Sequence, residues 1–98
     1  MGAAEYIDEQ LKGNKVVVFS KSYCPYCTKT KQLFKQLNVD AKVIELDQRD
    51  DGADIQSALA SRTGQKTVPS VWIKESFIGG NDDTQKKNSS GELAKLLA

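Results

Sequence analysis

The sequence predicts a single α/β domain, a small mixed four-stranded sheet with a parallel βαβ half, an antiparallel ββα half and helices on both faces. Three observations predict it. The chain has 98 residues, short of one average domain length, so we expect one domain over residues 1–98. About twenty residues with a helical pattern separate the first two β-type runs, which is the length of a parallel crossover. Only three residues separate the last two runs, as in an antiparallel hairpin.

The first half of the chain predicts a helix, a strand, a second helix and a second strand. Residues 3–12 place apolar side chains four positions apart among charged ones, and Gly13 follows as the C-cap. Residues 15–20 contain a continuous apolar run, typical of a strand covered on both faces. A helix over residues 25–38 and a weakly alternating strand over residues 41–46 complete the βαβ unit. The apolar positions behind these predictions are Ile7, Leu11, Val16, Val17, Val18, Phe19, Leu33, Phe34 and Leu37.

The second half predicts a third helix and a hairpin. Asp50 or Asp51 caps the start of this helix, and Gly64 follows its end as the C-cap. The hairpin strands are residues 71–73 and 77–78, without the Asn-Gly pair that would define the turn type. The apolar face of the third helix consists of Ile55, Ala58 and Leu59.

The last predicted helix reaches Leu97, and Asn81, Asp82 or Asp83 is expected to cap its start. A Ser-Ser-Gly sequence at residues 89–91 interrupts it, so we expect two helical pieces or a kink. The single tryptophan, in the first hairpin strand, is expected to pack in the core.

Composition excludes several classes of function. Fourteen Lys and Arg against thirteen Asp and Glu leave a net charge of +1, so we expect no nucleic-acid partner held through its phosphates. No segment approaches the roughly 20 apolar residues of a membrane span, so we expect no membrane partner. The chain has no histidine, which excludes Ser-His-Asp and Cys-His catalysis and imidazole metal sites. We therefore expect no metal cofactor.

The two cysteines, Cys24 and Cys27, form one Cys-x-x-Cys motif and are the strongest candidate nucleophiles. Without histidine they cannot close a usual tetrahedral zinc site within one chain, and so short a loop makes a poor structural staple. Cys-x-x-Cys where a strand passes into a helix is typical of a redox pair. The alternatives are two buried apolar cysteines, or a metal site completed by a second chain or a thiol cofactor.

Cys24 is expected at the N-cap of the helix that Pro25 begins. There, unpaired backbone N–H groups and the helix dipole favour thiolate over thiol, and Lys21 adds a nearby positive charge. Cys27 follows three residues later in the first turn, where it is more shielded and within disulfide reach. We therefore expect Cys24 to be the attacking sulfur and Cys27 the resolving one.

Three segments closely resemble the dithiol glutaredoxins in motif, order and spacing: residues 21–27 (KSYCPYC), residues 67–69 (TVP) and residues 79–83 (GGNDD). The thioredoxins resemble only the Cys-x-x-Cys frame. The resemblance covers nearly the whole chain and implies a thioredoxin-like fold. It also implies a glutathione-dependent disulfide oxidoreductase, with glutathione as co-substrate and glutathionylated or disulfide-containing proteins as partners. We expect a monomer in the cytoplasm, because sparse cysteines and a redox motif suit a reducing compartment, although a removed targeting peptide would leave no trace.

The resemblance also implies roles for individual residues. Lys21, Pro25 and Tyr26 support the thiolate. The Val68–Pro69 bond is implied to be cis, although X-Pro bonds are usually trans, and this leaves the Val68 backbone free to pair with glutathione. The residues implied to bind glutathione are Lys21, Tyr26, Gln56, Thr67, Val68, Pro69, Gly80, Asp82 and Asp83.

Three of these residues are implied to hold the charged ends of glutathione. Gln56 reaches the glycyl carboxylate, the backbone N–H of Asp82 the γ-glutamyl carboxylate, and the side chain of Asp83 the ammonium group. Without the resemblance, a helical Gln56 would face solvent and the two aspartates would cap a helix. Capping and binding are compatible.

Two rival functions stay open. In an iron–sulfur carrier, two chains would each give Cys24 and two glutathiones would complete the cluster ligands, but Pro25 is expected to restrict the loop. In a thioredoxin-type protein, glutathione would play no part, and the glycine pair of residues 79–83 argues against this. Asn81 stands where many glutaredoxins carry a further cysteine, which excludes regulation through an additional intramolecular disulfide.

Overall fold

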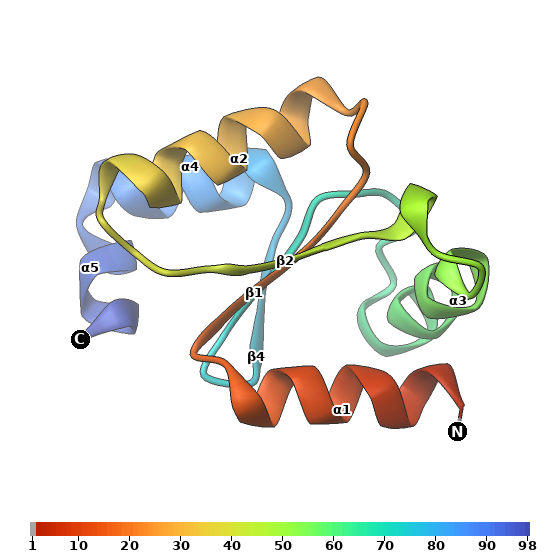
Figure 1. The fold of residues 1–98 in the computed structure, drawn as a ribbon. Helices are drawn as coiled ribbons and strands as arrows, with labels where there is room; N and C mark the ends of the chain where they lie inside the picture. The colour runs from red at the N-terminus through yellow and green to blue at the C-terminus, as the bar shows by residue number, and fades with distance from the viewer. Residues whose placement is uncertain (1) are drawn as a thin grey trace.

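The computed structural model describes residues 2–98. These residues form a four-stranded sheet in the order β2 (Lys42–Glu45), β1 (Val16–Ser20), β3 (Ser70–Ile73) and β4 (Ser76–Gly79). β1 and β2 run parallel, whereas β3 is antiparallel to both β1 and β4 (Figure 1). The predicted mixed sheet with its βαβ and ββα halves is therefore confirmed.

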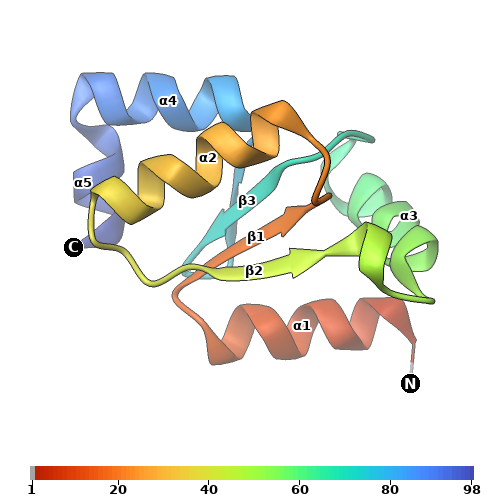
Figure 2. The ribbon, with the colours of Figure 1, turned by 45° about the horizontal axis from the view of Figure 1, so that its top comes forward.

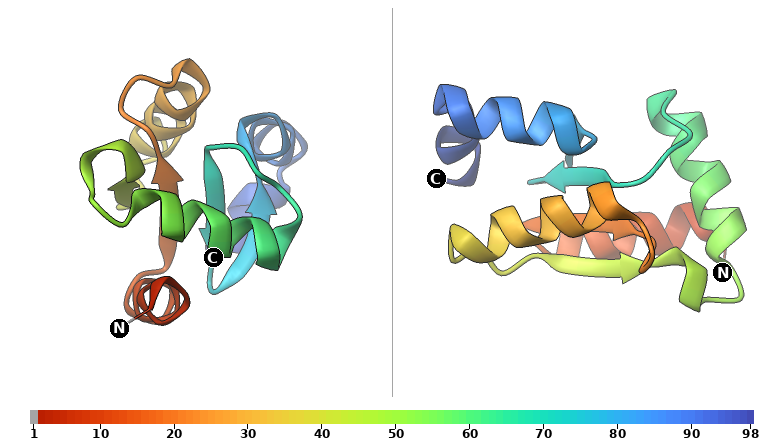
Figure 3. Two further views of the ribbon diagram at one scale, coloured as in Figure 1. Left: turned by 90° about the vertical axis from the view of Figure 1, so that its right-hand side faces the viewer. Right: turned by 90° about the horizontal axis from the view of Figure 1, so that it is seen from above.

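Helices cover both faces of the sheet (Figure 2). α1 (Ala3–Gly13) and α3 (Gly52–Thr63) pack on one face. α2 (Pro25–Gln36), α4 (Asn81–Ser90) and α5 (Glu92–Leu97) pack on the other, where α2 and α4 lie against each other (Figure 3). Within residues 2–98, none of these helices combines the length and apolar character needed to cross a membrane.

Strand β1 is the centre of the core. Val17 and Phe19 pack beneath α1 and α3, while Val16 and Val18 pack beneath α2, α4 and α5. All five residues of β1 are buried, as its continuous apolar run predicts. Trp72 is buried as expected, and its indole N–H donates a hydrogen bond within β3.

Two helices, α3 and α4, end at a glycine in the left-handed conformation. Gly64 follows α3 with a φ of 76°, which confirms the predicted C-cap. Gly91, with a φ of 85°, separates α4 from α5, so the prediction of two helical pieces is also confirmed. Gly13, in contrast, is the last residue of α1, and Asn14 is its C-cap.

The predicted N-cap position is confirmed for α3, although without a capping bond, and is wrong for α4. Gly80 is the N-cap of α4, and within residues 2–98 no side chain caps this helix. Asn81 cannot cap it because its side chain is buried, where the Thr30 hydroxyl donates to it at 2.9 Å. Asp51 is the N-cap of α3 but makes no capping bond, because its carboxylate pairs with Arg49 at 2.8 Å.

The β3–β4 hairpin turns at Lys74 and Glu75, whose φ angles are 49° and 69°. Two positive φ values describe a type I′ turn, which matches the right-handed twist of the flanking strands. Neither residue is the Asn or Gly that usually marks this turn, which explains why the sequence left its type open.

Candidate active site

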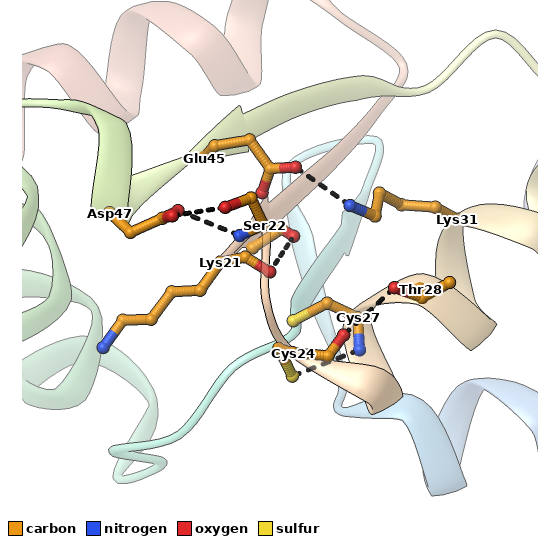
Figure 4. A network of polar contacts seen from close by, with 9 residues as sticks. Lys21, Ser22, Cys24, Cys27, Thr28, Lys31, Glu45 and Asp47 are labelled. Carbon is orange, nitrogen blue, oxygen red and sulfur yellow. Dashed lines mark hydrogen bonds and ion pairs between the residues drawn. The ribbon is translucent and has the colours of Figure 1, made fainter.

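Cys24 lies where β1 passes into α2, at the edge formed by the carboxyl ends of β1 and β2 (Figure 4). It is the N-cap of α2, with Pro25 as the first helical residue, as the sequence predicts. Its Sγ accepts the backbone N–H of Cys27 at 3.3 Å and lies 4.0 Å from the carbonyl oxygen of Val68. The sulfur therefore sits at the positive end of the helix dipole.

Cys27 is fully buried in the first turn of α2, whereas Cys24 is partly exposed, and both are free thiols. The pKa of the Cys27 thiol is raised to about 11, first by burial and then by its hydrogen bond with Cys24. Hydrogen bonds with the Lys21 backbone and the Ser20 side chain act in the opposite direction. At neutral pH, Cys27 is therefore a protonated and hidden thiol, and Cys24 is the sulfur that an incoming disulfide meets.

Two hydrogen bonds from Ser22 to Asp47 hold the loop between β1 and Cys24 (Figure 4). The backbone N–H of Ser22 donates to Oδ1 at 2.9 Å, and its hydroxyl donates to Oδ2. Ser20 at the end of β1 is paired with Glu45 at the end of the parallel strand β2. Ser22 and Asp47 each follow two residues later, so they meet at the same edge of the sheet. Sequence analysis missed this contact, whose partners are 25 residues apart.

Replacing Asp47 with Ala is expected to slow alkylation of Cys24 by iodoacetamide at pH 7 by about threefold to tenfold, because two bonds to a carboxylate then no longer hold the loop. Ser22→Ala is the matched variant, since it keeps the N–H bond and should lose less. The pKa of Asp47 is lowered by its bonds to Ser22, so this effect is fully present at neutral pH and fades only as pH falls below the ordinary range of an aspartate. Equal alkylation rates in Asp47→Ala and the parent would contradict a positioning role.

A groove of about 240 Å³ lies next to Cys24. Its walls are the start of α2, the loop before β3 and the start of α4. The Val68–Pro69 bond in that loop is cis, as the resemblance implied. Among the residues implied to bind glutathione, those lining the groove are Tyr26, Thr67, Val68, Pro69, Gly80, Asp82 and Asp83.

The start of α4 gives one end of this groove both donors and negative charge. The first-turn backbone N–H groups of α4 have no acceptor within the helix, and no side chain among residues 2–98 caps them. Asp82 and Asp83 add carboxylates in the same turn. Asp83 packs so closely on Gly79 that a Cβ there would lie 2.3 Å from its Oδ2, and the φ of 128° also requires glycine. N–H donors beside carboxylates suit a ligand end that carries both a carboxylate and an ammonium group.

A family model described as Glutaredoxin matches residues 16–78, the segment that contains both cysteines and the cis bond. The chain belongs to the glutaredoxin family. It is 55% identical over 89 residues to Glutaredoxin of Ricinus communis, covering 91% of this chain and 87% of that protein. It is 49% identical over 94 residues to Glutaredoxin-C4 of Arabidopsis thaliana, covering 96% and 70%. The predicted oxidoreductase function is therefore confirmed.

Solved glutaredoxin structures share the whole fold. The buckwheat glutaredoxin–glutathione complex superposes with a TM-score of 0.95 at 45% identity, covering 97% of this chain and 86% of that one. A crystal structure of wheat glutaredoxin gives a TM-score of 0.93 at 53% identity, covering 97% and 88%. The thioredoxin-like fold implied by the sequence resemblance is confirmed.

Two residues implied to bind glutathione lie outside the groove of this glutaredoxin. The Lys21 side chain points away from Cys24 in Figure 4. The Gln56 amide donates to the carbonyl oxygen of Lys66 at 2.9 Å, and the two residues line a separate hollow beside α3. Their roles in binding stay predictions, and both require the side chain to turn toward a bound ligand.

Sequence analysis missed Gln65, which lines the groove and stabilises the loop before β3. Its Nε2 donates to the carbonyl oxygens of Thr67 and Pro69, each at 3.0 Å. A polar residue directly after the C-cap of a helix shows no sequence pattern that predicts hydrogen bonds to the following loop. Only its closeness to the Thr-Val-Pro segment could have suggested it.

Proposed function

We propose that this glutaredoxin uses glutathione to reduce mixed disulfides between glutathione and proteins, and also protein disulfides, with Cys24 as nucleophile and Cys27 as resolving thiol. One observation carries the proposal. The partly exposed sulfur of Cys24 lies 4.0 Å from the carbonyl oxygen of Val68, a residue of the groove that ends at the N–H donors and carboxylates of α4, while the second thiol is buried.

The proposed cycle for a mixed disulfide has two exchanges. The Cys24 thiolate attacks the glutathione sulfur, the old S–S bond breaks, and the substrate leaves as a thiolate that takes a proton from water. A second glutathione, as thiolate, then attacks the glutathione sulfur bound to Cys24. Glutathione disulfide leaves and the Cys24 thiolate is regenerated, so one disulfide is consumed and one is formed.

A protein disulfide requires the second cysteine. Cys24 first forms a mixed disulfide with one substrate sulfur, and the other substrate sulfur leaves as a thiolate. Cys27 loses its proton and attacks Cys24, which releases the reduced protein and closes a Cys24–Cys27 disulfide. Two glutathiones then reduce this bond. Because the pKa of Cys27 is raised to about 11, loss of its proton is an added cost of this resolving step at neutral pH.

Specificity for glutathione is proposed to come from the groove, because thiol exchange alone does not select one thiol. The Val68 backbone would pair with the cysteinyl part, as an added strand does. The start of α4, with Asp82 and Asp83, would hold the amino-acid end. The buckwheat relative in complex with glutathione supports this ligand.

The test is reduction of a glutathionylated small-molecule disulfide by the parent protein with glutathione as reductant. We expect saturable turnover, followed as glutathione disulfide formed. An inert parent would refute the proposal. Reduction by a thioredoxin reductase alone would then support the thioredoxin-type rival, and a visible chromophore with a dimer after anaerobic reconstitution would support the cluster carrier.

A further inference from the structure

Asn81 is a polar residue in a nearly buried position at the head of α4. Only 8% of its surface is exposed. Its Oδ1 accepts the hydroxyl of Thr30 at 2.9 Å and the side-chain amide of Gln85 at 3.2 Å. Thr30 is fully buried one turn beyond Cys27, so this contact joins the helix of the active site to the helix that closes the groove.

The two bonds leave the other end of the amide free. A carbonyl oxygen has two lone pairs, and here both are used, so any further hydrogen bond of this amide must come from the two donors of Nδ2. Nδ2 makes no hydrogen bond within residues 2–98. Among these residues it is also not one of the fully buried atoms that lack a partner, so it is accessible from outside the protein. Asn81 lines the groove together with Gly80 and Asp82, so the groove is open space beside this residue.

We propose that Asn81 determines specificity by donating a hydrogen bond from Nδ2 to the carboxylate at the amino-acid end of glutathione; this inference rests on the proposed function. The unpaired backbone N–H groups at the start of α4 point to an anion, and Nδ2 adds a donor whose direction Thr30 and Gln85 fix. A donor fixed in advance loses little freedom when the ligand arrives. The neighbouring aspartates attract the ammonium group of the same end.

The test compares two thiols as reductants of the pre-oxidised protein, which carries the Cys24–Cys27 disulfide. Glutathione has the γ-glutamyl end, and cysteinylglycine lacks it. Asn81→Asp keeps the shape and the acceptor but replaces the donor with a carboxylate oxygen. We expect it to lower the second-order rate constant for glutathione about tenfold and to leave that for cysteinylglycine within about twofold.

Two further variants separate binding from folding. Thr30→Val removes the buried hydroxyl but keeps Nδ2 and the bond from Gln85, so we expect a lower melting temperature and a smaller fall in the glutathione rate than in Asn81→Asp. Thr30→Val/Asn81→Leu replaces both partners with apolar groups of similar shape, which limits the loss of stability. We expect this double variant to lose glutathione reactivity selectively without adding any charge.

Three outcomes would overturn the assignment of Asn81: an unchanged glutathione rate in Asn81→Asp, an equal loss for both thiols, or normal selectivity in the double variant. If glutathione reduces the parent protein no faster than cysteinylglycine does, the proposal that the groove binds glutathione is refuted. That result is read from the parent alone, so the two failures are distinguishable.

Discussion

Cys24→Ser is expected to lower glutathione-dependent turnover of a glutathionylated small-molecule disulfide by more than about a thousandfold. A serine hydroxyl stays protonated at neutral pH and cannot accept a sulfur in disulfide exchange. Cys27 cannot substitute, because it is fully buried and the pKa of its thiol is raised to about 11. Initial rates of glutathione disulfide formation measure the effect.

Cys27→Ser is the matched control, since it makes a similar substitution three residues away. The proposed cycle for mixed disulfides uses only Cys24 and a second glutathione, so we expect this variant to keep much of the parent activity. Reduction of a protein disulfide should fall much further in the same variant. If Cys24→Ser turned over normally, or if Cys27→Ser were as inactive as Cys24→Ser, the division of roles would be wrong.

The raised pKa of Cys27 gives this pair of variants a pH signature. In Cys24→Ser, alkylation of Cys27 should be slow at pH 7 and should rise steadily toward pH 11, because burial is the first cause of the shift and persists in the variant. Alkylation of Cys24 in Cys27→Ser should be faster than that of Cys27 at pH 7, because Cys24 is the partly exposed thiol.

The parts of this site that a short stretch of sequence defines could be predicted. The strand run of β1, the proline at the start of α2 and the spacing of the cysteines together place Cys24 at the N-cap and Cys27 in the first turn. All three are local signals, because dihedral preference and helix geometry act over only a few residues. The cis Val68–Pro69 bond needed the family resemblance as well.

Contacts between distant segments could not be predicted. Asp47 meets Ser22, and Asn81 meets Thr30, only after the sheet and helices have packed. Asn81 also shows how packing overrides a local preference. An asparagine at the start of a helix is a good candidate cap, but the buried hydroxyl of Thr30 needs a partner, and Asn81 supplies it.

Gly52→Ala is expected to destabilise the fold by about 3 kcal/mol or more, which corresponds to a fall in melting temperature of more than about 10 °C. Gly52 is buried at the first position of α3, beneath the short helix η1 (Leu46–Gln48). A Cβ there would lie 1.9 Å from the carbonyl oxygen of Leu46 and 2.8 Å from its carbonyl carbon. These are backbone atoms of a buried residue, so no side-chain rotation can relieve the clash.

Gly13→Ala is the matched control for this substitution. Gly13 is also helical, at the end of α1, but a Cβ there meets no atom of residues 2–98 within 4 Å. We expect it to stabilise the protein by about 0.5–1 kcal/mol, because alanine loses less backbone freedom on folding. Thermal unfolding of both variants measures the contrast. Equal melting temperatures would show that η1 can move aside without cost.

The position of Gly52 also connects stability to the active site. Asp47 follows Leu46 in η1, so an alanine that pushes Leu46 away from α3 should move the carboxylate that holds Ser22. At a temperature where Gly52→Ala is still folded, alkylation of Cys24 should therefore slow toward the rate of Asp47→Ala, while Gly13→Ala keeps the parent rate. A destabilised Gly52→Ala with fully reactive Cys24 would show that the displacement of Leu46 does not reach Asp47, and the link between Gly52 and the active site would then be wrong.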